Sequence, residues 1–149
     1  MMPLKRALLG FALLAALATG AAGQQSTAVT KVAIQVNENN PATMNLALNN
    51  AQNIIAEFKK KGEKVEIEVV TYGPGLHMLR DDTSPVKSRI ATLSLEHPNL
   101  VFQACANTQA NQSKQEGKEV KLVGEAKVTA SGVVRLIELQ KQGYAYIRP

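Results

Sequence analysis

Residues 31–41 read KVAIQVNENNP, and this stretch sets the plan of the chain. The β-branched run KVAIQV predicts a short strand, and the polar residues 37–40 form a loop after it. Asn40 can cap a helix that begins at Pro41, since the first N–H groups of a helix have no partner and proline lacks one. Apolar residues then recur at helical spacing as far as Phe58. The stretch therefore predicts a strand, a loop and a capped helix in series.

The same alternation continues along the chain. Further strands are predicted over 65–72, 100–104, around 127–129 and over 144–147. A helix is predicted over 86–96, with Val86, Ile90, Leu93 and Leu95 on the inner side. Further helices are predicted over 109–116, capped by Asn107 or Thr108, and over 133–142, with Val133, Leu136, Ile137 and Gln140 on one face. Strands separated by helices pair in parallel through right-handed crossovers. We expect an α/β three-layer sandwich with a five-stranded parallel sheet in the order 2-1-3-4-5.

Composition narrows the class of protein. A chain of 149 residues with 45% hydrophobic and 19% charged residues is typical of one globular domain. Aromatic residues make up 4%, without tryptophan, which argues against a stacking surface for single-stranded nucleic acid. The formal net charge is +5, and two of the positive charges, Lys5 and Arg6, lie in the N-terminal segment. We predict no nucleic-acid partner, and with one cysteine and two histidines we predict no metal and no cofactor.

Residues 1–23 predict a secretory signal peptide. A basic start is followed by the apolar run ALLGFALLAALA (7–18) and then by small residues. The apolar run is shorter than the ~20 residues that span a bilayer, so we expect cleavage rather than membrane anchoring. The predicted mature protein has a short tail over 24–30 and an α/β domain over 31–149. We expect it to be exported, to a bacterial periplasm, with no membrane contact after cleavage.

Cys105 follows the third predicted strand and is the leading candidate for a catalytic residue. In open parallel sheets, sites form beyond the carboxyl ends of the strands, where the strand order reverses. The order 2-1-3-4-5 would bring the loops 37–40 and 105–108 together at that point. A following helix N-terminus favours a thiolate and lowers the thiol pKa. The alternative is a buried and inert cysteine.

His77 is the second candidate catalytic residue. It follows the end of the second strand and can approach Cys105 to stabilise a thiolate, or it can cap a helix or face solvent. The loops that would surround the two residues supply the candidate ligand-binding residues Asn37, Gly73, Gly75, Asn107 and Thr108. A single cysteine excludes a disulfide or a redox pair within the chain.

Three stretches carry a resemblance to a known family. They are TYGPGLHML (71–79), ACANT (104–108) and SGVVRL (131–136), the last continuing through Gln140 to GYAYI (143–147). Together they resemble the DsrE/DsrF-like family, in particular a small exported branch of it, over about residues 31–149. The resemblance implies a flavodoxin-like fold of five parallel strands and assembly as a trimer or hexamer. In some members a cysteine after the third strand carries a persulfide in a sulfur relay, and Cys105 matches that position.

Two functions of different classes are consistent with these features. The first is a sulfur carrier or transferase in which Cys105 accepts a persulfide from a donor protein and passes it to an acceptor protein. It requires Cys105 to be accessible. The second is a non-catalytic oligomeric module that binds a small ligand or a protein and in which Cys105 is packed in the interior.

Overall fold

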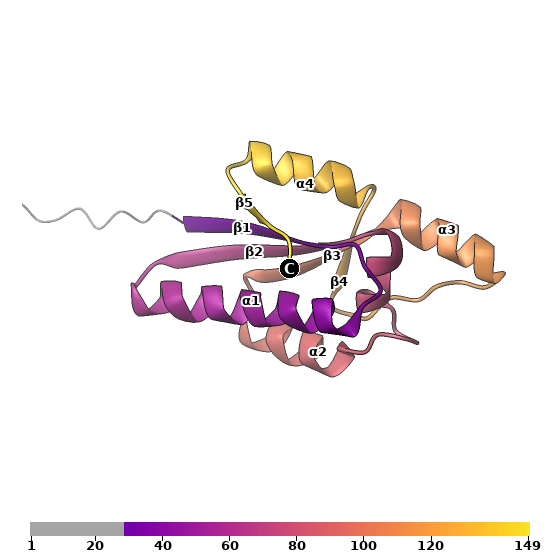
Figure 1. Cartoon of the computed structure of the whole chain (residues 1–149), viewed down its shortest axis with the longest axis horizontal. Helices are drawn as coiled ribbons and strands as arrows, with labels where there is room; N and C mark the ends of the chain where they lie inside the picture. Colours follow the sequence, from indigo (N-terminus) through magenta and orange to yellow (C-terminus); the bar gives the residue numbers. More distant parts are fainter. Residues whose placement is uncertain (1–28) are drawn as a thin grey trace, which may run out of the picture.

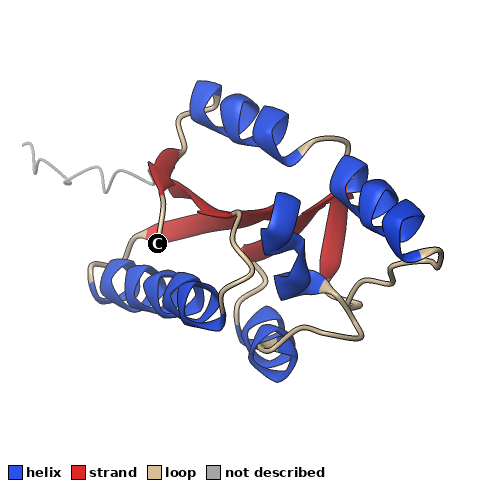
Figure 2. Ribbon diagram, turned by 45° about the vertical axis from the view of Figure 1, so that its right-hand side comes forward, coloured by secondary structure: helices blue, strands red, loops and turns tan. Residues whose placement is uncertain are grey.

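The structure is a computed structural model that describes residues 29–149. The predicted signal peptide lies outside the described residues, as does most of the predicted tail. A parallel sheet forms the centre of the domain and helices surround it (Figures 1 and 2). In chain order the elements are β1 (Val29–Val36), α1 (Pro41–Lys60), β2 (Lys64–Thr71), the 3-10 helix η1 (Gly73–Leu79), α2 (Lys87–Glu96), β3 (Leu100–Cys105), α3 (Ala106–Glu116), β4 (Ala126–Thr129), α4 (Gly132–Lys141) and β5 (Ala145–Ile147).

The five-stranded parallel α/β fold is confirmed, but the predicted strand order is wrong. The observed order is β4-β3-β2-β1-β5, so β2 and not β1 lies beside β3. The register from Ile67↔Leu100 to Thr71↔Ala104 fixes this pairing. The two short strands β4 and β5 form the edges, and all of their residues are exposed or half-buried, whereas β2 is buried along most of its length. Interior strands of parallel sheets are buried on both faces, which explains why the apolar β2 belongs inside the sheet.

Two layers of helices cover the sheet. Figure 1 shows α1 and α2 below the sheet, α4 above it and α3 beyond its carboxyl end. The larger core lies on the side of α1 and α2, and its largest fully buried side chains include Ile34, Met44, Leu48, Ile67, Ile90 and Phe102. The smaller core on the other face consists of Ala33, Val70, Leu136 and Leu139. The three-layer arrangement therefore has one strongly apolar interface and one small one.

The first βα unit forms as the sequence predicts. The Asn40 side chain accepts a hydrogen bond from Ala42 N at 2.8 Å, and Pro41 is the first residue of α1. Gly62 follows the helix with φ of +71°, a conformation that glycine adopts without strain. Local signals alone thus define both ends of α1.

Among the residues that the structure describes, no helix is long and apolar enough to cross a membrane.

Some predicted helix faces and caps are wrong. Leu95 is 82% exposed, and Val133 and Ile137 are each 50% exposed, so none of them faces the core. The buried residues of α4 are Gly132, Leu136 and Leu139. α4 packs its Leu136 and Leu139 side onto the sheet, which leaves its other apolar residues in solvent. The N-cap of α3 is neither Asn107 nor Thr108 but Cys105 itself.

Candidate functional site

The sulfur of Cys105 lies at the start of α3. β3 ends at Cys105 and α3 begins at the next residue, so the side chain takes the position of a helix cap. Its Sγ accepts a hydrogen bond from Thr108 N at 3.5 Å. Cys105 is only 4% exposed, and it forms no disulfide. The strand-to-helix junction therefore places a buried thiol against the free N–H groups of a helix start.

A second helix also begins at this sulfur. The backbone N–H of Gly132, the first residue of α4, also faces the Cys105 sulfur and helps to lower the pKa of the thiol. Gly132 is required for this approach, because a Cβ atom there would lie 2.9 Å from the Tyr72 Cβ and 3.0 Å from its ring. Both helices direct the positive ends of their dipoles at the sulfur. The arrangement favours a negative charge on Cys105.

Burial and hydrogen bonding act in opposite directions on the thiol. Burial by itself raises the pKa of Cys105. The Thr108 hydroxyl donates to the sulfur and lowers the pKa, and the backbone N–H groups of Gly132, Thr108 and Asn107 lower it further. The hydrogen bonds prevail, and the pKa of Cys105 lies below that of an ordinary cysteine. The site thus stabilises a thiolate although it is closed to solvent.

Thr108 also connects the cysteine to the loop after β2. Its hydroxyl accepts a hydrogen bond from Gly73 N at 3.0 Å, and Gln112 Nε2 of α3 donates to Gly73 O at 3.3 Å. Two of the candidate ligand-binding residues, Gly73 and Thr108, are therefore in direct contact. Because the hydroxyl accepts from Gly73, its hydrogen is free to point at the sulfur.

Gly75 and Asn37 form a structural contact. A Cβ atom on Gly75 would lie 2.7 Å from the Asn37 Cα and closer still to the Val36 carbonyl group. Gly75 is buried, so the backbone of η1 packs directly on the end of β1. With β2 between β1 and β3, the loop that begins at Asn37 is not the immediate neighbour of Cys105. The close approach of these two loops explains why a glycine is needed there.

His77 does not contact the thiol. Its Nδ1 lies 3.0 Å from Thr83 Oγ1, and none of the groups that determine the pKa of Cys105 belongs to it. Instead, His77 lines a polar pocket of about 410 Å³ between η1 and α3. Gly73 and Thr108 line the same pocket, together with Asn39, Pro74, Asn111, Gln112, Gln115 and Glu116. Three candidate residues therefore meet in one pocket, and one of them, Thr108, also contacts the sulfur.

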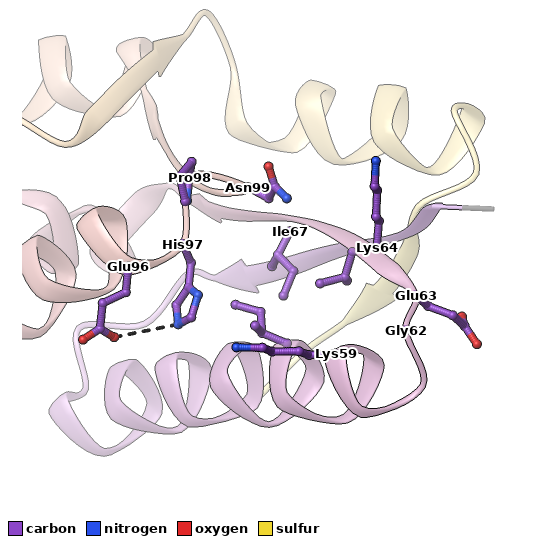
Figure 3. A pocket seen from close by; sticks show the side chains of 11 residues that line it. Lys59, Gly62, Glu63, Lys64, Ile67, Glu96, His97, Pro98 and Asn99 are labelled. Atoms are coloured by element: carbon purple, nitrogen blue, oxygen red, sulfur yellow. Dashed lines mark ion pairs between the residues drawn. The ribbon is translucent and has the colours of Figure 1, made fainter. Parts of the chain in front are cut away.

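A second pocket, of about 360 Å³, lies at the opposite edge of the sheet. The end of α1, the start of β2 and the turn before β3 line it. In Figure 3, Lys59 extends toward His97, which lies 3.8 Å from Glu96, while Glu63 points away. His97 follows the end of α2 directly. This pocket is separate from Cys105, which lies at the carboxyl edge of the sheet.

Three residues of the cysteine environment were not predicted from the sequence. They are Gly132 and Tyr72, which define the second helix start, and the buried Arg80, which binds α3. A glycine directly before an apolar helix was the only local signal for Gly132, and nothing near Arg80 in sequence indicates its partner Glu116. Within residues 29–149 no three His, Cys, Asp or Glu side chains gather in a way that could hold a metal ion.

The fold and the site define a class: a flavodoxin-like α/β protein with one thiol at the carboxyl end of its third strand. A scan against protein-family models matches the DsrE/DsrF-like family over residues 12–149, and the chain belongs to this family. A similar solved structure is that of a protein of unknown function, MTH1491 from Methanobacterium thermoautotrophicum. It has 30% identity and a TM-score of 0.68, and the alignment covers 80% of this chain and 99% of that one. A search of curated proteins found no significant match.

Proposed function

We propose that the protein is a sulfur carrier or transferase that holds a persulfide on Cys105. The observation that supports this most strongly is the convergence of two helix N-termini on a single thiol whose pKa is lowered. The same N–H groups would stabilise the negative charge of a persulfide. Membership of the DsrE/DsrF-like family, which is associated with sulfur relay, supports the same chemistry.

The proposed transfer is a thiol exchange with no net oxidation. The Cys105 thiolate attacks the outer sulfur of a persulfide donor R–S–SH and forms a new S–S bond. The S–S bond of the donor breaks, and R–S⁻ leaves with the electron pair. Cys105 then carries –S–SH, which loses its proton in the same cradle of N–H groups. Passage to an acceptor thiol repeats the step with Cys105 as the leaving group.

A direct test is to load the protein with a low-molecular-weight persulfide and measure its intact mass. We expect the wild-type chain to gain one sulfur atom on Cys105 and to lose it to a small thiol. The Cys105→Ser variant should gain none. A folded wild-type protein that stays unmodified at every donor concentration would contradict the proposal.

The burial of the thiol supports a second candidate function. At 4% exposure Cys105 could serve as a packed residue in a module that binds a ligand in the polar pocket beside Thr108. Alkylation of the folded protein separates the two candidates. Reaction of Cys105 without global unfolding favours the carrier, and complete protection until unfolding favours the binding module.

Self-association and export belong to the same proposal. The exposed apolar residues Val133, Val134 and Ile137 of α4 offer a surface that a trimer or hexamer would bury. Light scattering that shows only a monomer at high concentration would contradict assembly.

Export to a periplasm would be tested by N-terminal sequencing of protein from an exporting host. We expect the exported protein to start near Gln24, and an intact Met1 would contradict export with cleavage.

A further inference from the structure

Arg80 is a buried charged residue that lies outside the sulfur chemistry described above. It follows η1 directly and is 2% exposed, the largest of the fully buried side chains. Its Nε and Nη2 donate to the two carboxylate oxygens of Asp82, at 2.9 and 2.8 Å. Asp82 lies only two residues after Arg80, and this local ion pair leaves the other side of the guanidinium free to bind a residue from another helix or strand.

The far side of Arg80 binds the last turn of α3. Its Nη2 donates to Glu116 Oε2 at 2.9 Å, and its Nη1 donates to Glu116 Oε1 and, at 3.4 Å, to Gln112 Oε1. Glu116 is the last residue of α3, and the chain turns away from the helix at Gly117 with φ of +63°. A paired, planar contact of this kind fixes both distance and orientation.

α3 depends on such polar contacts because it buries none of its side chains within the described part of the chain. Glu116 also lies 3.8 Å from Lys118 Nζ, two residues along the chain, and Lys118 in turn lies 3.4 Å from Asp82. The other attachments of α3 to the domain are neutral hydrogen bonds, among them Gln109 Nε2 to Val120 O at 2.8 Å and Val120 N to Ser113 Oγ at 2.9 Å. α1, α2 and α4 each bury apolar residues against the sheet. Without hydrophobic anchoring, the charged contact at Arg80 is the strongest single attachment of α3.

We infer that Arg80 is a positioning residue for Cys105: through Glu116 it holds α3 in place, and α3 in turn holds and covers the sulfur. The clamp at one end of the helix and the thiol at the other belong to one rigid element of 11 residues. When Glu116 separates from Arg80, α3 tilts from the sheet and its first turn moves off the sulfur. The clamp therefore sets both the access to Cys105 and the number of N–H groups that face it. The inference rests on the proposed thiol chemistry of Cys105, but not on sulfur as the group transferred.

The test measures alkylation of Cys105, the only thiol of the chain, as a function of pH in the Glu116→Gln variant. Glu116 is exposed enough for this change to preserve the fold, and Arg80 keeps its ion pair with Asp82. We expect a several-fold higher plateau rate at high pH, because the thiol becomes accessible more often. We also expect the inflection of the profile to move to higher pH, because the first turn of α3 stabilises the thiolate less.

A matched control is Arg89→Gln. Arg89 links α2 to α1 through Asn45, Asn49 and Gln52, so its loss also removes polar contacts between elements, but far from Cys105. We expect its alkylation profile to match that of the wild type. Arg80→Lys is the second test variant: it keeps the charge and loses the planar fork, so its profile should lie between those of the wild type and Glu116→Gln.

Two results would overturn the inference. One is a Glu116→Gln profile that coincides with the wild type. The other is a change that only follows the loss of global stability, measured by denaturant unfolding of all three variants. Faster alkylation of Glu116→Gln in a protein that takes up no persulfide would uphold the clamp and refute the sulfur carrier. If the wild type takes up persulfide but Glu116→Gln is alkylated like the wild type, the sulfur carrier is upheld and the clamp is refuted.

Discussion

α3 and α4 begin at the same sulfur and are attached to the domain by different forces. α4 buries Leu136 and Leu139 in the smaller core, while α3 has no buried side chain in the described part of the molecule. Hydrophobic burial is non-directional, so α4 stays attached as long as its apolar side chains stay buried. The ion pair and hydrogen bonds of α3 are separate directional contacts, and each can break while the core stays intact. One wall of the thiol site is therefore fixed, and the other can be released without opening a core.

The largest effect is expected where α4 is anchored. Leu139→Ala removes a fully buried side chain and should lower the free energy of unfolding by about 2–5 kcal/mol. Gln109→Ala removes a hydrogen bond of α3 and should cost about 0.5–1.5 kcal/mol. Urea denaturation followed by circular dichroism measures both. Equal losses would refute the contrast between the helices, and Ile137→Ala, on the exposed side of α4, serves as the control.

Gly132→Ala tests the fixed wall at the sulfur. The added Cβ would lie 2.9 Å from the Tyr72 Cβ, so the start of α4 must shift. We expect a loss of about 1–3 kcal/mol from overpacking. The Gly132 N–H would also move from the sulfur, which raises the pKa of Cys105. Gly124→Ala, with nothing within 4 Å of the new atom, is the matched control. An unchanged alkylation profile in Gly132→Ala would show that this N–H contributes nothing.

The smallest effect is expected from Thr108→Val, in the first turn of α3. The hydroxyl lowers the pKa of Cys105 by donating to the sulfur, so its removal should move the alkylation inflection to higher pH. Thr108→Ser keeps the donor and should resemble the wild type. The pH dependence of the free energy of unfolding should report the same change in pKa. A pKa that is lower in the folded state adds stability as pH rises from that pKa to the ~8.5 of a free thiol, and the variant should show less of this rise.

Local signals in the sequence were sufficient for the elements of secondary structure. Asn40 and Pro41 define the start of α1, and the apolar periodicity of α1 and α2 places Met44, Leu48, Ile90 and Leu93 inside. The position of Cys105 at a strand end before a helix was also evident from the sequence. These features depend on residues a few positions apart, whose preferences act before any tertiary contact forms.

The pairing of strands and the direction of helix faces were not evident in this way. Several strands have similar apolar faces, so a local pattern does not state which neighbour each one takes. Only the short, exposed β4 and β5 could have been recognised as edges. For α4, Val133 and Ile137 are as apolar as Leu136 and Leu139, and only the tertiary packing of Leu136 and Leu139 with Ala33 and Val70 separates the two sides.

The amino-acid sequence is therefore sufficient for the α/β class, the family and the cysteine that the proposed chemistry needs. What surrounds that cysteine depends on tertiary contacts: Gly132 comes from a segment 27 positions later in the chain, and Arg80 binds Glu116 across 36 positions. The same contacts pair His77 with Thr83 and not with Cys105, and the sequence had left both arrangements open. The physical reason is that the pKa and the accessibility of a thiol depend on the groups within a few ångströms of it, and chain order does not fix which groups those are.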